Sequence, residues 1–183
     1  LADEIKTGPI STDSKEFEEA EKNVEERINT LMNIKGNKTV DSFHKELGRI
    51  MWEYAGMSRN EKGLKKAIKD IASLKNEFWK NVRIPGDQYG LNSELEKAGR
   101  VADLLELGEL FAKDALERNE SCGGHFREES VELDGEQKGE AKRDDKNYTH
   151  VSAWEYTGKP SEAILHKEKL EFNDIELKQR SYK

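Results

Sequence analysis

The fold is decided by the stretch from Ser93 to Gly124, which reads SELEKAGRVADLLELGELFAKDALERNESCGG. Its apolar side chains largely recur at spacings of three and four residues, as on one face of an α-helix. These positions are Leu95, Ala98, Val101, Leu105, Leu110 and Leu116. We predict a helix that begins near Asn92 or Ser93, because Glu96 completes a capping box with Ser93. It should run to about Glu120, and the glycine pair that closes the stretch marks its end.

Three earlier stretches show the same helical periodicity. They cover residues 14–34, 39–54 and about 58–82, and the last of them follows a cap signal at Ser58 to Asn60. Helix-stopping residues follow each of them, namely Gly36, Gly56 and the pair Pro85–Gly86. We therefore expect a mainly α fold, an antiparallel three- to four-helix bundle similar to a spectrin repeat. The third and fourth helices should form its centre, because their apolar stripes are the most regular.

The sequence changes character after the last predicted helix. Most residues from Arg127 to Lys146 are charged and follow no apolar period, so this segment is predicted to be a solvated loop or disordered. Two short strands are expected next, at Tyr148–Tyr156 and Ser161–Lys167. Their β-hairpin should pack on the helices or on a missing partner, because an isolated hairpin is marginally stable. The predicted domains are a lead-in at 1–13, a helical bundle at 14–126 and a charged loop with a β-hairpin tail at 127–183.

The composition argues against several classes of function. The 183 residues carry a net charge of -7 and no block of Lys and Arg free of acids. Neither nucleic acid nor an anionic membrane is therefore an expected partner. No apolar run approaches the roughly 20 residues that span a bilayer, and we expect no signal peptide. The single cysteine, Cys122, can form no intramolecular disulfide and suits a reducing compartment.

No catalytic motif is visible in the sequence. The chain has neither a dinucleotide-binding glycine run nor a phosphate loop, and His44 lacks the Glu-x-x-His context of a di-iron bundle. Cys122 and His125 could share a zinc ion, but such a site needs two more ligands, for which His150 and His166 could be offered. The alternative is that the glycine pair turns the chain and His125 forms a hydrogen bond across the turn. We expect no catalytic, cofactor-binding or metal-binding residue.

Four aromatic residues allow two interpretations, Trp52, Trp79, Trp154 and Tyr156. Aromatic side chains are enriched at the anchors of protein interfaces, but they are also ordinary parts of a core. For Trp52 and Trp79, on predicted helices, the core is the simpler interpretation. For the two hairpin residues both interpretations stay open.

A family resemblance rests on the segment from Arg118 to Glu129, which reads RNESCGGHFREE. It resembles the motif Arg-x-Glu-Ser-Arg-Gly-Ala-His-x-Arg-x-Asp near the C-terminus of succinate dehydrogenase and fumarate reductase flavoprotein subunits. The residues on the family's positions are Glu120, Ser121, Gly123, His125 and Arg127. Further along, the run Arg143, Asp144, Asp145 is similar to the family's Arg-Asp-Asp, and Arg180 with Tyr182 is similar to its Arg-x-Tyr ending.

The sequence departs from the family motif at two positions. Cys122 stands where most members have Arg, which removes a charged fork and any bidentate pair it made, and Gly124 stands where most have Ala. The tail from Trp154 onward resembles the longer, quinone-linked form of anaerobic Bacteroides-like bacteria. L-aspartate oxidase shares this domain and is a competing assignment. A free-standing helical adaptor that binds a protein partner is a second alternative.

The resemblance implies a division of labour within a longer subunit. Family members carry FAD in an N-terminal domain, and a capping domain supplies the arginine that delivers a proton as hydride moves between flavin and fumarate. None of those residues maps onto this chain. The resemblance implies as partners the missing FAD and capping domains of the same chain and an iron-sulfur subunit with its clusters. A membrane anchor is an indirect partner, so the expected location is cytoplasmic, peripheral on the inner face of the cell membrane. Fumarate reduction and succinate oxidation both remain open.

The family-like motif itself is predicted to be structural. Gly123 should adopt a positive φ to close the helix end, because glycine reaches that conformation at little steric cost. His125 should make an internal hydrogen bond. Arg127 should pair with an acid such as Glu120, Asp144 or Asp145. If the motif residues were exposed instead, they would be a contact surface for the missing domain or subunit.

Overall fold

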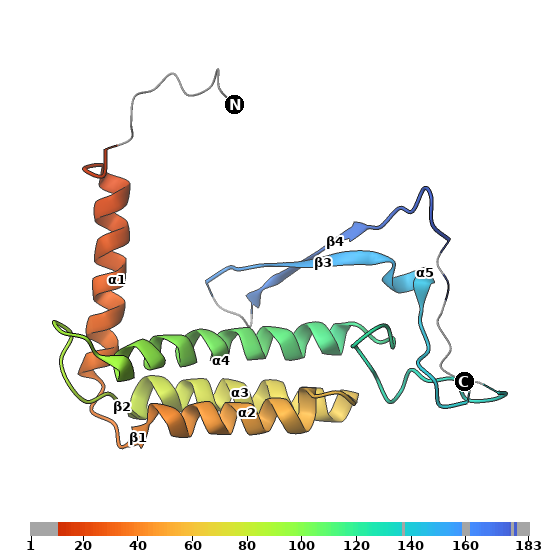
Figure 1. Ribbon diagram of the computed structural model, residues 1–183, viewed down its shortest axis with the longest axis horizontal. Coiled ribbons are helices and arrows are strands. Elements are labelled where there is room, and N and C mark those ends of the chain that lie inside the picture. The colour runs from red at the N-terminus through yellow and green to blue at the C-terminus, as the bar shows by residue number, and fades with distance from the viewer. Residues whose placement is uncertain (1–10, 137, 159–161, 177, 179–183) are drawn as a thin grey trace.

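Three helices form the body of the protein in the computed structural model, which describes residues 11–136, 138–158, 162–176 and 178. They are α2 (Val40–Ala55), α3 (Glu61–Asn81) and α4 (Ser93–Glu117). They lie side by side, and each runs antiparallel to the one before it in the chain. Helix α1 (Lys15–Asn33) stands across one end of the three (Figure 1). The mainly α class predicted from the sequence is confirmed.

Side chains at the helix starts set where α3 and α4 begin. Asn60 Oδ1 accepts a hydrogen bond from the Gly63 amide at 2.8 Å, as the cap signal before α3 predicts. At α4 the cap is Asn92, whose Oδ1 accepts from the Leu95 amide at 3.0 Å. The helix ends at Glu117, three residues earlier than predicted, because the backbone is already extended at Arg118.

The core lies between these three helices, and α3 and α4 supply most of it. Ile71, Phe78 and Leu105 are fully buried, and Phe43 of α2 packs edge-on against Phe78 with ring centroids 5.2 Å apart. At Gly108 of α4 an added Cβ would already touch Leu47 and Met51 of α2 at 3.4 Å. A larger residue there would push the two helices apart.

Helix α1 does not join the bundle along its length. Its predicted apolar stripe buries only Leu31 fully, at 2% exposure, whereas Phe17 and Val24 are 48% and 59% exposed. The bundle of the described residues therefore has three helices. The periodicity of α1 is real, but it predicts an apolar face and does not say what covers that face.

A short parallel pairing, which the sequence did not indicate, joins the two ends of the α2–α3 hairpin. Strand β1 (Lys38–Thr39) pairs with β2 (Val82–Arg83). An added Cβ at Gly36 would lie 1.9 Å from the Asn81 carbonyl oxygen, so the close approach before β1 requires glycine.

The charged segment after the bundle is an ordered loop over its described residues, so the disordered alternative is wrong there. Its two arms pair, since the Glu132 amide donates to Glu140 O at 2.9 Å and the Lys142 amide donates to Ser130 O at 3.0 Å. A short helix that sequence reasoning missed, α5 (Asp145–Tyr148), follows the loop.

The predicted β-hairpin is present and lies along α4 (Figure 1). Strand β3 (His150–Glu155) pairs antiparallel with β4 (Ile164–Lys169). Trp154 Nε1 donates to Asp114 Oδ1 of α4 at 2.8 Å, and Lys167 pairs with Glu117 at 2.7 Å. The predicted start of the second strand, Ser161, lies outside the described residues.

The remaining aromatic residues divide between core and surface. Trp79 is partly buried against Phe78, as expected. Trp52 is 86% exposed, so the core interpretation is wrong for it, and Tyr156 is 64% exposed. None of the helices in the described part of the chain has the length and apolar character needed to cross a membrane.

Replacement of Ile71 tests the position of the core. Ile71→Ala leaves a cavity between α3 and α4 and should lower the free energy of unfolding by about 2–5 kcal/mol. Val24→Ala, on the exposed face of α1, should change it by less than about 0.5 kcal/mol. Urea unfolding followed by circular dichroism measures both, and equal midpoints for the two variants would contradict the assigned core.

Candidate functional site

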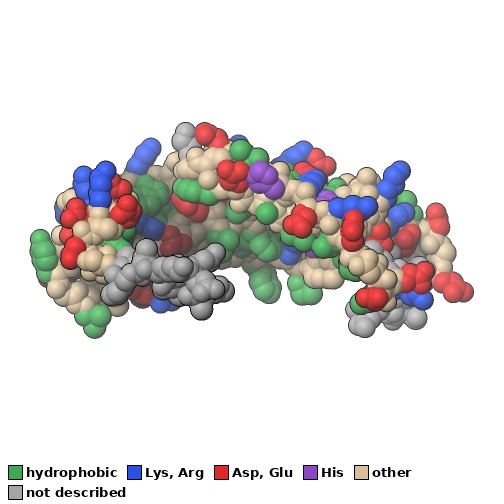
Figure 2. Space-filling model, turned by 90° about the horizontal axis from the view of Figure 1, so that it is seen from above, with side chains coloured by type: hydrophobic (Ala, Val, Ile, Leu, Met, Phe, Trp, Pro, Cys, Tyr) green, Lys and Arg blue, Asp and Glu red, His purple; other side chains and the backbone are tan. Residues whose placement is uncertain are grey.

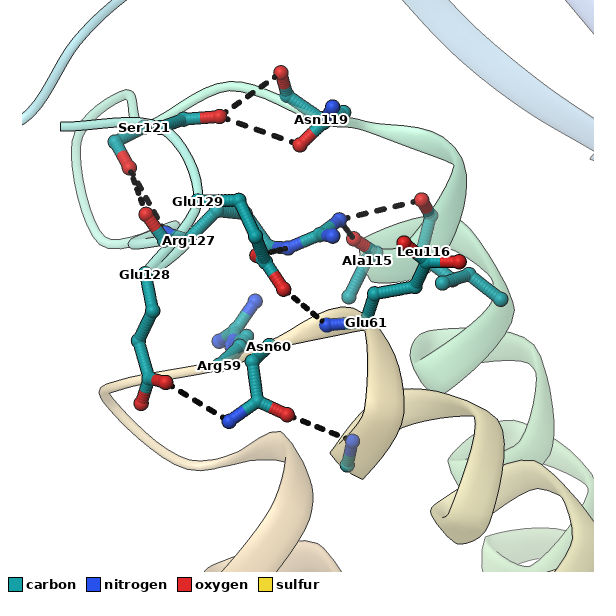
Figure 3. A network of polar contacts seen from close by, with 12 residues as sticks. Arg59, Asn60, Glu61, Ala115, Leu116, Asn119, Ser121, Arg127, Glu128 and Glu129 are labelled. Atoms are coloured by element: carbon teal, nitrogen blue, oxygen red, sulfur yellow. Dashed lines mark hydrogen bonds and ion pairs between the residues drawn. The ribbon is translucent and has the colours of Figure 1, made fainter.

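The family-like motif forms a tight turn directly after α4. The Cys122 amide donates to His125 O at 2.8 Å and the His125 amide donates to Cys122 O at 3.1 Å, so Gly123 and Gly124 form the tip. Gly123 has a φ of +59°, which confirms the predicted left-handed conformation. The turn brings the residues after it back beneath the end of α4 (Figure 3).

Arg127 is the buried centre of this arrangement, with a side chain only 2% exposed. Its Nη1 donates to the carbonyl oxygens of Ala115 at 3.0 Å and Leu116 at 3.2 Å. A helix leaves its last carbonyls without partners and places partial negative charge there, so a guanidinium is well suited to this position. Arg127 therefore caps the C-terminal end of α4.

Arg127 does pair with an acid, as predicted, but the acid is not one of those named. Its Nε pairs with Glu129 Oε2 at 3.1 Å, and not with Glu120, Asp144 or Asp145. The reason is the backbone of Arg127: its amide donates to Ser121 Oγ at 2.8 Å, and that hydroxyl donates to Arg127 O at 3.1 Å. These two bonds turn the Arg127 side chain under the helix.

The predicted partner Glu120 is buried but serves another contact. Its Oε1 accepts from Arg118 Nε at 2.8 Å, and its Oε2 accepts from the Asp144 amide at 2.8 Å. Asp144 in turn caps α5 by accepting from the Asn147 amide at 3.2 Å. Arg143 Nε donates to Asp145 Oδ1 at 3.0 Å. Glu120 thus ties the Arg-Asp-Asp segment to the helix end. The other predicted motif residues, Arg180 and Tyr182, lie outside the described residues.

His125 makes the internal hydrogen bonds expected of it. Its Nε2 lies 2.7 Å from Arg118 O, and its Nδ1 lies 2.9 Å from Arg59 Nη1. A carbonyl only accepts and a guanidinium only donates, so Nε2 carries the proton and Nδ1 accepts. Burial lowers the pKa of His125, and the nearby positive charge of Arg59 acts in the same direction. The imidazole is therefore neutral and both nitrogens are occupied.

Sequence reasoning missed the residues on the α2–α3 turn that the motif contacts (Figure 3). The Arg59 amide donates to Phe126 O at 3.1 Å, and the Glu128 amide donates to Arg59 O at 2.8 Å. The Glu129 carboxylate accepts from the Glu61 amide at 2.6 Å, at the start of α3. Acids near a helix N-terminus are stabilising, but no sequence period indicates that residues so far apart meet.

We call this set of residues the helix-end clasp. It comprises Arg59, Glu120, Ser121, His125, Arg127 and Glu129. It joins three separate parts of the chain: the end of α4, the turn between α2 and α3, and the start of the tail.

A pocket of about 360 Å³ opens beside the clasp. It is lined by Arg59, Phe111, Asp114, Ala115, Arg118, Cys122 and His125. The Arg59 guanidinium lies 5.0 Å from the centre of the Phe111 ring. Over the described part of the chain, no three His, Cys, Asp or Glu side chains converge as metal ligands would. The Arg59 and Arg118 side chains and the Phe111 ring make the pocket suited to holding an acidic or apolar group.

Comparison with known proteins gives the chain a family. The model of the family "Fumarate reductase flavoprotein C-term" matches residues 44–182. An uncharacterized FAD-dependent oxidoreductase of Methanocaldococcus jannaschii is 32% identical over 148 residues, which are 76% of this chain and 26% of that protein. The fumarate reductase flavoprotein subunit of Haemophilus influenzae is 30% identical over 113 residues, 62% of this chain and 19% of that protein.

The fold is also found among solved structures. A quinol-fumarate reductase with menaquinol molecules matches with a TM-score of 0.74 and 23% identity, over 94% of this chain and 28% of that chain. An L-aspartate oxidase of Synechocystis is 31% identical over 101 residues, but these are only 48% of this chain. Aspartate oxidase is thus the weaker of the two assignments. The chain spans about a quarter or less of the length of these relatives.

Removal of the Arg127 side chain should destabilise the bundle itself. Arg127→Ala leaves the buried carbonyls of Ala115 and Leu116 without a donor, at a cost of about 1–3 kcal/mol. Arg49→Ala, which removes an exposed arginine of α2, should leave the thermal midpoint almost unchanged. Equal thermal midpoints for the two variants would show that Arg127 does not cap α4.

The glycine pair offers an internal control for backbone strain. Gly123→Ala should lower stability by about 1 kcal/mol or more, because its φ is positive. Gly124→Ala, one residue along, has ordinary φ and open space around its Cβ, so its stability should stay at the wild-type level. Chemical denaturation of both variants provides the test, and equal effects would refute the left-handed turn.

The lowered pKa of His125 makes stability depend on pH. The ordinary pKa of histidine is about 6.5. Below that pH, the His125 imidazole takes up a proton more readily in the unfolded chain than in the folded chain. The contribution of His125 to stability should therefore be fully present above about pH 6.5 and should be lost as the pH falls below that value, through the lowered pKa of the folded state. Melting curves of His125→Gln should show a flatter dependence over this range. A variant with the wild-type slope would show that His125 is not the group responsible.

Proposed function

The chain belongs to the fumarate reductase flavoprotein C-terminal family, and from that premise we propose that it is part of a subunit that interconverts fumarate and succinate with FAD. The chain spans about a quarter or less of its relatives, so the flavin chemistry belongs to the remainder of such a subunit.

The observation that carries this proposal is the helix-end clasp. Its guanidinium, carboxylate and imidazole groups form hydrogen bonds with one another and with backbone groups. Glu120, His125 and Arg127 are each held by bonds of this kind, which stabilise the structure. On this basis we propose that the domain supports the packing of the flavoprotein subunit and that the catalytic and cofactor-binding residues lie elsewhere in that subunit.

The same proposal supplies the partners. Solved structures that share this fold include a quinol-fumarate reductase and Sdh1 of Mycobacterium smegmatis. The domain would lie in an assembly with the FAD and capping domains of its own chain and an iron-sulfur subunit that holds the clusters. A membrane anchor would then be an indirect partner and hold the assembly at the cytoplasmic face.

Flavin content tests the division of labour. The purified 183-residue chain should be colourless and should reduce no fumarate, because the residues that bind FAD lie elsewhere in the subunit. The full-length subunit should carry the flavin and the activity. The visible absorption spectrum and a fumarate reduction assay give both readouts. A yellow 183-residue chain with near-stoichiometric flavin would overturn the proposal.

A further inference from the structure

An uncovered apolar strip runs along the face between α2 and α4. Leu104, Leu107 and Phe111 recur at helical spacing on α4 and are 39%, 60% and 44% exposed. With Met51 of α2 they line a groove of about 250 Å³. The buried core residues of α4 lie on a different face of the same helix. Single exposed apolar side chains are normal, but a contiguous set marks an interaction site.

This strip continues into the pocket beside the helix-end clasp, because Phe111 lines both. At that end lies Arg59, which forms no ion pair with a carboxylate among the described residues. Its Nη1 donates to neutral His125, and its Nε donates to Gly56 O at 2.8 Å. Asp114 also lines the pocket, but its Oδ1 accepts from Trp154. The strip is therefore mainly apolar, with His44 also in the groove lining, and it is cationic at one end.

Other sides of α4 are already covered by the protein itself. The core occupies one side, and the hairpin lies along another through Trp154 and Lys167. Figure 2 shows hydrophobic side chains at the surface near the middle of the elongated molecule, where charged side chains do not cover them. An apolar surface of this kind is typical of an interface that stays closed, since obligate interfaces are more hydrophobic than transient ones.

We propose that this strip, comprising Met51, Leu104, Leu107, Phe111 and Arg59, is the docking surface for the remaining, FAD-carrying part of the same polypeptide. The inference rests on the proposed function. That portion would place apolar side chains over α4 and an acidic side chain at Arg59. It is the favoured occupant because relatives are about four times as long as the matched region, and because a covalent link makes docking effectively intramolecular.

Hydroxyl-radical footprinting read by mass spectrometry tests the docking surface on the 183-residue chain and on the full-length subunit. Met51 and Phe111 should be oxidised in the short chain and lose most of that oxidation in the full-length subunit. Tyr89, which is 90% exposed in the loop before α4, should react equally in both. Equal oxidation of Phe111 in the two proteins would overturn the proposal. Protection that appears only after the iron-sulfur subunit is added would also overturn it.

A pair of matched variants of the full-length subunit adds a second readout. Leu107→Asp places a charge in the strip and should restore oxidation of Phe111, whereas Leu133→Asp, at a similarly exposed leucine of the charged loop, should not. Flavin content and fumarate reduction of the wild-type subunit are recorded alongside. A full-length subunit without flavin contradicts the proposed function. A flavin-containing, active subunit with an unprotected strip contradicts the docking surface alone.

Discussion

The contact between the Arg127 guanidinium and the last carbonyls of α4 is the constraint on which the rest of the motif depends. A helix of 25 residues ends in the interior of the protein, and its carbonyls must find donors there. Arg127 supplies them while less than a twentieth of its side chain is exposed. To arrive beneath the helix the chain must reverse within a few residues, which requires the positive φ of Gly123. The Ser121 hydroxyl then fixes the Arg127 backbone.

The other motif residues follow from that placement. Once Arg127 lies under α4, Glu128 and Glu129 reach the α2–α3 turn and the start of α3. His125 can then bridge Arg118 and Arg59 as a neutral ring. Cys122, which the resemblance aligns with an Arg of the family motif, lines the adjoining pocket. A thiol fills less of that space than a guanidinium would. The motif is thus better understood as a joint between helix, turn and tail than as a site of chemistry.

Local patterns predicted the local features of this structure. Periodicity located the helices, Asn60 signalled a cap that the structure confirms, and the glycine pair indicated the turn. The predictions that failed concern contacts between distant segments of the chain. Arg127 pairs with Glu129, because the path of the backbone decides which acid it meets. The face of α1 has the spacing of a buried helix, yet Phe17 and Val24 are exposed. Neither periodicity nor charge specifies a partner across the fold, so these features required the structure.

Native-state hydrogen exchange of the wild-type chain tests the central claim most directly, since it compares the opening of the clasp with the opening of the bundle. The informative amides are those of Arg59, Arg127 and Glu128, which bond to Phe126 O, Ser121 Oγ and Arg59 O. If the clasp is integral to the fold, these amides exchange with the same free energy of opening as the amide of Leu105 in the middle of α4. Exchange of the clasp amides orders of magnitude faster than that of Leu105 would show that the motif opens independently of the helices, and would contradict the account.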